Sequence, residues 1–453
     1  MKKTLFLLSI FLTYFNGIKA QNWDSLSSGL NGFVHSLAVY KGELYAGGNF
    51  SRAGHIKASG IAKWNDTTWS TVGLGVTWGT YPDITSLIVY KGNLYAGGYY
   101  MSAGKNCAAI AMWNGTTWTL IGTVTGVTYP NVSSMAVYNG ILYVGGGFTS
   151  VNGISTNNIA MWNGTTWTSL GSGLVPSNYA YVFSMCSFDS ILYVAGEFDT
   201  ADGVPCNNIA QWNGTKWSAV GKSIANTDIL SLCIYDSKLY AGGSFTALGG
   251  SSHTFDWWDG STWSSVGLGA LNSQSGGPWS MMAANGGIVI AGTIGPAGSG
   301  NNYDVEYWNG NKVDSIGSGF VIDSGMNALC MYNNKLYAGG SEMYSGNTLI
   351  NHIARWNHPL PVGINSITLQ NNSISIFPNP SKGLFTIQSA SVNINVKVEV
   401  YNMLGEVVYM QTLQQIQGDH TIDLSNETDG IYLFRMLTET GNLVSTGKLI
   451  IQK

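Results

Sequence analysis

The sequence predicts an all-β protein with two parts, a ring of seven four-stranded sheets followed by a small β-sandwich. Three observations carry this prediction. A motif with two tryptophans around a tight turn recurs about every 50 residues, glycine accounts for 59 of 453 residues, and the pattern of short strands changes after Pro361. Charged residues make up 10% and aromatic residues 12% of the chain, which excludes an intrinsically disordered protein.

The first 20 residues have the pattern of a secretory signal peptide. Lys2 and Lys3 precede an apolar run from Leu5 to Phe15, and Ala20 supplies the small residue expected at a cleavage point. This run is shorter than the ~20 residues of a membrane-spanning helix. No second run of that length follows, so we expect a mature chain without a transmembrane segment.

Two series of aromatic residues define the repeat over residues 21–358. A Leu-Tyr-Ala-Gly-Gly motif or a close variant of it recurs in six units, with Ile290 in the equivalent place of another unit, and a tryptophan recurs in all seven. The tyrosines are Tyr45, Tyr95, Tyr143, Tyr193, Tyr240 and Tyr337, and the tryptophans are Trp64, Trp113, Trp162, Trp212, Trp258, Trp308 and Trp356. Units of about 50 residues with four strands each predict a seven-bladed β-propeller.

The third unit shows the four strands most plainly, at 132–138, 141–148, 157–162 and 165–171. Asn-Gly joins the first strand to the second and the third to the fourth, because both residues accept a positive φ in a hairpin turn. This turn places Trp162 and Trp167 on the same blade face, where we expect them to form the core rather than bind a ligand. The same role explains the Asn-Gly-Thr triplets headed by Asn114, Asn163 and Asn213 as turns instead of glycosylation sites.

The seventh unit lacks a fourth strand, since Pro359 and Pro361 follow Trp356 closely. The segment WDSLSSGL beginning at Trp23 matches WTSLGSGL beginning at Trp167. We therefore expect the N-terminal segment to complete the last blade, which otherwise would have an unpaired edge.

With these features, residues 21–358 resemble propellers of the kelch and galactose-oxidase-like kind. The double glycine of the second strand, the aromatic residue of the third strand and the tryptophan hairpin carry the resemblance. It implies the fold and leaves the activity open, because propellers host unrelated functions.

After a linker at 359–372, residues 373–453 show alternating strands with Gly and Asp/Asn turns, which predict a small Ig-like β-sandwich. Its motifs resemble the type A C-terminal sorting domain of the type IX secretion system of Bacteroidota. The matching residues are Pro378, Asn379, Pro380, Gly383, Gly405, Gly430 and Tyr432. The resemblance implies handling by the type IX machinery, removal of this domain, and release or attachment at the cell surface.

Function is expected on one face of the ring. The tight turns lie on one face of the ring. The opposite face carries the loops between second and third strands and the blade-to-blade connections, which vary in sequence. Aromatic residues predicted on this variable face suit contacts with a glycan or a protein. They are Trp78, Tyr81, Tyr129, Tyr179, Tyr181 and Trp279.

Catalytic and metal-binding patterns are weaker. The six histidines form no close ligand pair, and Glu197, Asp199 and Asp202 lack the alternating oxygen ligands of a calcium loop, so we expect no cofactor and keep these acids as weak metal candidates. Five cysteines, an odd number, argue against a disulfide framework. The net charge of −4, with scattered charges, gives no basic track for nucleic acid.

Three functions remain open at this point. The leading hypothesis is a secreted or surface-attached, non-catalytic module that binds a glycan or protein through the variable face. The alternatives are a polysaccharide hydrolase or lyase that uses loop carboxylates, and a structural component of the cell envelope.

Overall fold

The computed structural model describes residues 23–75, 82–102, 105–176, 180–206, 208–221, 225–246, 252–266, 277–292, 304–317, 319–321, 325–360, 374–389, 395–402, 407–413, 418–438 and 443–453. The chain divides into two compact units, Met1–Pro361 and Val362–Lys453. The described residues form strands and turns without a helix, so none offers a helix of the length and hydropathy needed to cross a membrane.

The first unit consists of many small antiparallel sheets, and seven of those in its described residues are built on four-stranded meanders. The first four sheets in chain order are β2 (Phe33–Tyr40), β3 (Glu43–Asn49), β6 (Ile61–Trp64) and β7 (Trp69–Thr71); β8 (Asp83–Tyr90), β9 (Asn93–Ser102), β10 (Lys105–Trp113) and β11 (Trp118–Thr125); β12 (Asn131–Tyr138), β13 (Ile141–Gly147), β16 (Ile159–Trp162) and β17 (Trp167–Ser169); and β19 (Tyr181–Phe188), β20 (Ile191–Glu197), β23 (Ile209–Trp212) and β24 (Trp217–Ala219).

The remaining three sheets follow the same plan, and the last one takes its fourth strand from the N-terminal segment. They are β25 (Ala225–Tyr235), β26 (Lys238–Thr246), β27 (Ser252–Trp258) and β28 (Trp263–Ser265); β29 (Pro278–Ala284), β30 (Gly287–Gly292), β31 (Asp304–Trp308) and β32 (Val313–Ser315); and β34 (Met326–Tyr332), β35 (Lys335–Gly340), β38 (Ile353–Trp356) and β1 (Asp24–Ser25). In the last sheet Asp24 pairs with Arg355 and Ser25 with Ala354.

Small hairpins occupy four of the loops between second and third strands, which are therefore more regular than their sequences indicate. These hairpins are β4 (Arg52–Ala53) with β5 (Ile56–Lys57), β14 (Ser150–Val151) with β15 (Ile154–Ser155), β21 (Thr200–Ala201) with β22 (Val204–Pro205), and β36 (Tyr344–Ser345) with β37 (Thr348–Leu349). The β14–β15 hairpin extends the second sheet through β11, and the strands β18 (Leu174–Val175) and β33 (Phe320–Val321) pair with β21 and β36.

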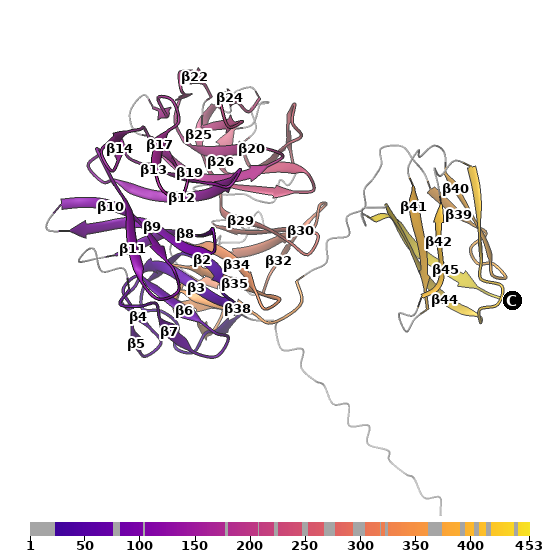
Figure 1. The fold of residues 1–453 in the computed structure, drawn as a ribbon. Coiled ribbons are helices and arrows are strands. Elements are labelled where there is room, and N and C mark those ends of the chain that lie inside the picture. Colours follow the sequence, from indigo (N-terminus) through magenta and orange to yellow (C-terminus); the bar gives the residue numbers. More distant parts are fainter. Residues whose placement is uncertain are drawn as a thin grey trace, which may run out of the picture. The chain divides into compact units, whose positions relative to one another are not determined.

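The first strands of the seven sheets contact one another in cyclic order, β2, β8, β12, β19, β25, β29, β34 and back to β2. Figure 1 shows several of these strands gathered toward the middle of the unit. Tyrosine hydroxyls at the ends of five of them donate to a backbone carbonyl in the first turn of the following sheet, at 2.7–3.2 Å. One of these bonds, from Tyr332 to Gly42, joins the last sheet to the first.

The tryptophans pack as pairs within a sheet and also bond the sheets together. Trp162 lies directly opposite Trp167 with ring centroids 5.0 Å apart, and five other sheets repeat this pair. The second indole of each pair donates its N–H to a carbonyl of the preceding sheet, as Trp167 does to Ile121 at 2.8 Å. The other donors are Trp23, Trp69, Trp118, Trp217 and Trp263.

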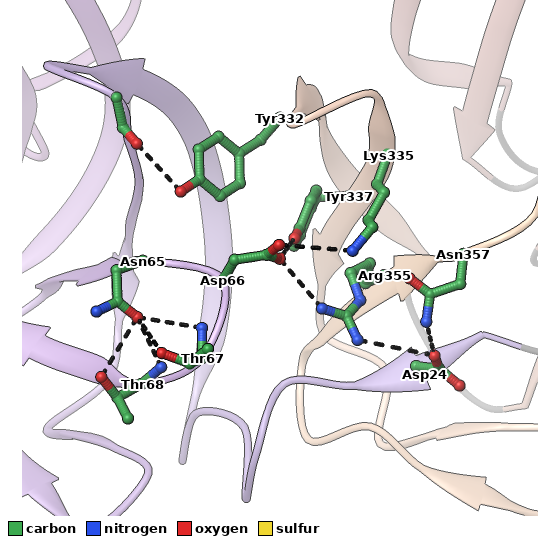
Figure 2. A network of polar contacts seen from close by, with 11 residues as sticks. Asp24, Asn65, Asp66, Thr67, Thr68, Tyr332, Lys335, Tyr337, Arg355 and Asn357 are labelled. Atoms are coloured by element: carbon green, nitrogen blue, oxygen red, sulfur yellow. Dashed lines mark hydrogen bonds and ion pairs between the residues drawn. The ribbon is translucent and has the colours of Figure 1, made fainter.

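An acidic side chain in the first sheet reaches across to the last sheet (Figure 2). Asp66 occupies the turn between β6 and β7 with a φ of 78°, where the next units have glycine. Its carboxylate accepts hydrogen bonds from the Tyr337 hydroxyl at 2.8 Å and from Arg355 at 3.1 Å, and Lys335 lies 3.5 Å away. Burial opposes ionisation, but these partners outweigh it and lower the pKa of Asp66.

The second unit has two antiparallel sheets that share one core. One sheet contains β39 (Ile374–Phe377), β40 (Leu384–Ser389) and β43 (Gly418–Asp423), and the other contains β41 (Val396–Tyr401), β42 (Val407–Leu413), β44 (Gly430–Thr438) and β45 (Leu443–Ile451). Phe385 and Ile422 from the first sheet pack with Val398 and Met436 from the second.

Residues of the sorting-domain motif hold this unit together. The Asn379 side chain donates to the carbonyl of Lys448 at 2.6 Å and accepts from the amide of Ile450 at 2.9 Å, so it ties the turn before β40 to the last strand. A Cβ on Gly383 would lie 2.7 Å from the Cα of Ser425, which explains the glycine there. The Tyr432 hydroxyl donates to the carbonyl of Thr428. Gly405 lies outside the described residues.

Replacing Trp23 by alanine tests the closure of the ring. Trp23 is fully buried, packs against Trp356 and Phe320, and donates to Ile316 at 3.0 Å. Removing a buried indole costs about 3–5 kcal/mol, so we expect a clear loss of melting temperature for this unit in calorimetry, and a larger loss on deleting residues 21–30. Leu74→Ala, at an 88% exposed side chain, is the control. An unchanged melting temperature in the Trp23 variant would contradict the shared sheet.

Replacing Asp66 by asparagine tests the contact between the first and last sheets. Because the native pKa of Asp66 is lowered, its ionic contacts stabilise the fold above the ordinary carboxyl pKa of about 3.9 and are lost as pH falls through the lower native value. We expect Asp66→Asn to reduce the free energy of unfolding by about 1–2 kcal/mol near neutral pH, and the difference from wild type to shrink below about pH 4. Denaturant titrations at several pH values measure both effects. A difference in unfolding free energy that does not vary with pH would show that the charge of Asp66 does not contribute to stability.

Candidate functional site

A cleft of about 700 Å³ lies between the third and fourth sheets of the first unit. Its lining comes from blade-to-blade connections, from loops between second and third strands, and from the strand ends beside them, which are the segments expected to carry function. The lining residues are Val127, Thr128, Tyr129, Gly147, Thr149, Asn157, Asn158, Val175, Pro176, Ala180, Tyr181 and Glu197.

Gly147 helps to form the cleft because it has no side chain at a position where the first two sheets have one. It ends β13 opposite Asn131, at the register position where the first two sheets have Asn49 and Tyr99. The Tyr181 ring of the next sheet lies so close that a Cβ on Gly147 would be 2.5 Å from it. Glycine at this position therefore lets Tyr181 lie across the backbone of β13.

Asparagine side chains fix one wall of the cleft. Asn158 is only 5% exposed; its side-chain oxygen accepts from the amide of Phe148 at 3.1 Å, and its nitrogen donates to the carbonyl of Leu174 at 2.7 Å. Asn157 donates to the carbonyl of Ser172 at 2.8 Å. These bonds connect the loop before β16 to the connection leading to the fourth sheet, so the wall is formed before any ligand arrives.

Two of the six aromatic residues singled out in the sequence, Tyr129 and Tyr181, line this cleft. Tyr129 is 63% exposed, whereas Tyr181 is half-buried and stacks on Phe183 with ring centroids 6.3 Å apart and an interplanar angle of 9°. Stacking on Phe183 thus holds the ring of Tyr181 in place, whereas the ring of Tyr129 is exposed to solvent.

The other four aromatic candidates lie elsewhere or outside the described residues. Trp279 is half-buried in β29 and does not line the cleft. The register between the first and second strands shifts at Trp279. The same shift occurs in the first strand of all seven sheets, and in β2 it falls on His35. Trp78, Tyr81 and Tyr179 are not among the described residues.

The three acidic candidates of the fourth sheet have different environments. Glu197 lines the cleft, and burial together with the nearby carboxylates of Asp228 and Asp199 raises its pKa. Asp202 instead accepts hydrogen bonds from the amide at 2.7 Å and the hydroxyl at 3.0 Å of Ser172, which lower its pKa and assign it to a turn. The described residues contain no group of three His, Cys, Asp or Glu side chains arranged to hold a metal ion.

One pair of chemical interest was missed in the sequence. Nε2 of His35 lies 3.3 Å from a carboxylate oxygen of Asp83, and burial raises the pKa of Asp83 while His35 acts in the opposite direction. Both residues stand near the start of the first strand in consecutive units, so aligning the repeats would have placed them together. The cysteines with described side chains form no disulfide, and burial raises their pKa values; they are Cys186, Cys206, Cys233 and Cys330.

Comparisons with known proteins identify the C-terminal segment. Residues 375–452 match the family described as a secretion system C-terminal sorting domain. This match implies handling by the type IX secretion system, export, and a secreted or cell-surface location. No curated protein matches the chain.

Among solved structures, the chain is similar to all-β folds of low sequence identity. The extracellular domain of a hybrid two-component system from B. thetaiotaomicron gives a TM-score of 0.48 at 12% identity, covering 83% of this chain and 45% of that one. A fungal alcohol oxidase of the AA5 family in complex with copper gives 0.46 at 13%, covering 96% and 100%. The WD40 β-propeller domain of Doa1 gives 0.44 at 14%, covering 75% and 97%. The chain thus spans less than half the length of the first of these proteins.

Proposed function

We propose that this protein is a secreted or surface-attached β-propeller that recognises a glycan in the cleft between its third and fourth sheets. The observation that carries the proposal is the cleft itself, where Tyr129 and Tyr181 stand with Glu197 on segments that a rigid ring holds in place. Exposed aromatic faces stack on the apolar faces of sugar rings, while carboxylate and amide groups bond to sugar hydroxyls.

The architecture behind this proposal is a seven-bladed, kelch-like ring over residues 21–358. The cyclic contacts of the first strands support it, as do the bond from Tyr332 to Gly42 and the pairing of β1 with β38. We further propose that a signal peptide at 1–20 is removed, that 359–372 form a linker, and that 373–453 form an Ig-like sorting domain of the Bacteroidota type, which is cleaved on export.

A glycan fits the cleft better than a protein surface does. A volume of about 700 Å³ lies within the ~300–1,000 Å³ of sites for small ligands. Stable protein partners instead bury roughly 800 Å² on each side across a broad face. A chain of a few sugar rings, or one end of a longer polysaccharide, matches a concave site of this size.

Tyrosine variants test the proposal. We expect a glycan array probed with the mature chain to give specific hits, and titration calorimetry with the best hit to show a tenfold or greater loss of affinity in Tyr129→Ala and Tyr181→Ala. Stacking on an aromatic side chain contributes about 1–3 kcal/mol, as measured for nucleic-acid bases, which corresponds to such a loss.

Tyr344→Ala is the control, because Tyr344 is a 43% exposed tyrosine in the loop between the second and third strands of the seventh sheet and does not line the cleft. Binding that the Tyr129 and Tyr181 variants retain in full would remove the cleft as the recognition site. An array without hits, with the variants correctly folded, would favour a protein ligand or a structural role in the envelope.

A second candidate function, polysaccharide cleavage, rests on Glu197. Its raised pKa suits a general acid, since a carboxyl group must stay protonated to give a proton to a leaving group. Incubating each array hit with the protein and analysing the products separates the two functions. Products that disappear in Glu197→Gln would support the enzyme, and binding without products would support the recognition module.

A further inference from the structure

We propose that the cleft selects glycans that carry a free amino group, and that Glu197 is the residue that determines this selectivity. The inference rests on the proposed glycan recognition and adds the charge of the ligand. The ligand class is a hexosamine chain without its N-acetyl groups, which presents a primary ammonium group on each ring.

The described lining of the cleft is acidic. Among the lining residues Glu197 is the charged one, and none of them is lysine, arginine or histidine. Burial raises the pKa of Glu197, and the nearby carboxylates of Asp228 and Asp199 raise it further, so acidic groups that repel one another gather at this point of the rim. A bound cation relieves that repulsion, whereas a uronic acid or another anionic sugar would increase it.

The neutral part of the cleft suits an ammonium group as well. The negative face of an aromatic ring attracts a cation, and the attraction grows when a carboxylate lies nearby to bond to its N–H groups. Tyr181 pairs with Glu197 directly across β19 and β20, so the fixed ring and the carboxylate belong to neighbouring strand ends. One residue pair therefore offers both a surface for a sugar ring and an acceptor for its amino group.

A neutral sugar would use the tyrosines but would leave the carboxylate of Glu197 with a weaker partner. A bond between an ammonium group and a carboxylate is roughly twice as strong as one between neutral groups. The difference between a charged and a neutral sugar of the same shape is thus the measurable consequence of the proposal.

Three tetramers with the same β-1,4 linkage provide the test: one of glucosamine, one of N-acetylglucosamine and one of glucose. In titration calorimetry of the mature chain at mildly acidic pH, where the amino groups of glucosamine are protonated, we expect the glucosamine tetramer to bind about tenfold more tightly than the other two. Glu197→Gln preserves the shape of the side chain and removes its charge. We expect this variant to lose that tenfold preference and to bind the glucose tetramer as the wild type does.

Salt and a distant acid serve as controls. Added sodium chloride should weaken the binding of the glucosamine tetramer to the wild type and have little effect on Glu197→Gln. Asp189→Asn removes a negative charge from the turn at the opposite end of the same sheet and should retain the preference.

The outcomes separate this inference from the function on which it rests. Equal binding of the three tetramers, or an unchanged preference in Glu197→Gln, would overturn the selectivity while leaving glycan recognition in place. No binding of any tetramer or array glycan would overturn the recognition itself. A lysine tetrapeptide that binds as tightly as the glucosamine tetramer, and competes with it, would show that the ammonium group alone is recognised and would overturn the assignment to an amino sugar.

Discussion

The pairing of β1 with β38 is the constraint on which the rest of the first unit depends. A ring of sheets that contact only their neighbours is as stable as its weakest junction, and an unpaired strand edge at that junction would invite other chains. Trp23 is fully buried there, and Trp69 of the first sheet donates to the carbonyl of Leu26 in the same N-terminal segment. The chain ends of the ring are thus joined by the same indole bond that joins consecutive sheets, and Asp66 adds an ionic contact across that junction.

The cleft is a local departure from a repeated plan. Each sheet holds its neighbours through buried aromatic residues, so the connecting segments are free to differ without loss of the core. Gly147 replaces a side chain at the end of β13, and Tyr181 moves into the space that this leaves. Asn158 then bonds both to Phe148 and to the connection beyond Leu174. The result is a site whose walls belong to rigid elements, which limits the entropy lost when a ligand binds.

Features with a local cause could be predicted from the sequence, and features that depend on distant partners could not. The repeat, the paired indoles such as Trp162 and Trp167, and the role of the N-terminal segment all follow from period and turn chemistry. In contrast, the acceptor of each second indole lies in the neighbouring sheet, so no pattern within a unit reveals it. The contact of Tyr181 with Gly147 likewise joins residues from adjacent units. Among the acids of the fourth sheet, only the structure separates Glu197 in the cleft from Asp202 in a turn.

The number of carboxylates in the cleft bears on whether the proposed glycan ligand would be bound or cleaved. Glycoside hydrolysis by the usual routes needs two carboxyl groups on either side of the scissile bond, about 5–9.5 Å apart. The described lining supplies one, Glu197, while Asp199 and Asp228 act on it through their charge from outside the lining. Recognition of a cationic sugar, as proposed above, requires only a carboxylate beside aromatic rings. Cleavage would require one of the two aspartates to move into the cleft when the glycan binds, and such a movement would work against the repulsion that already raises the pKa of Glu197.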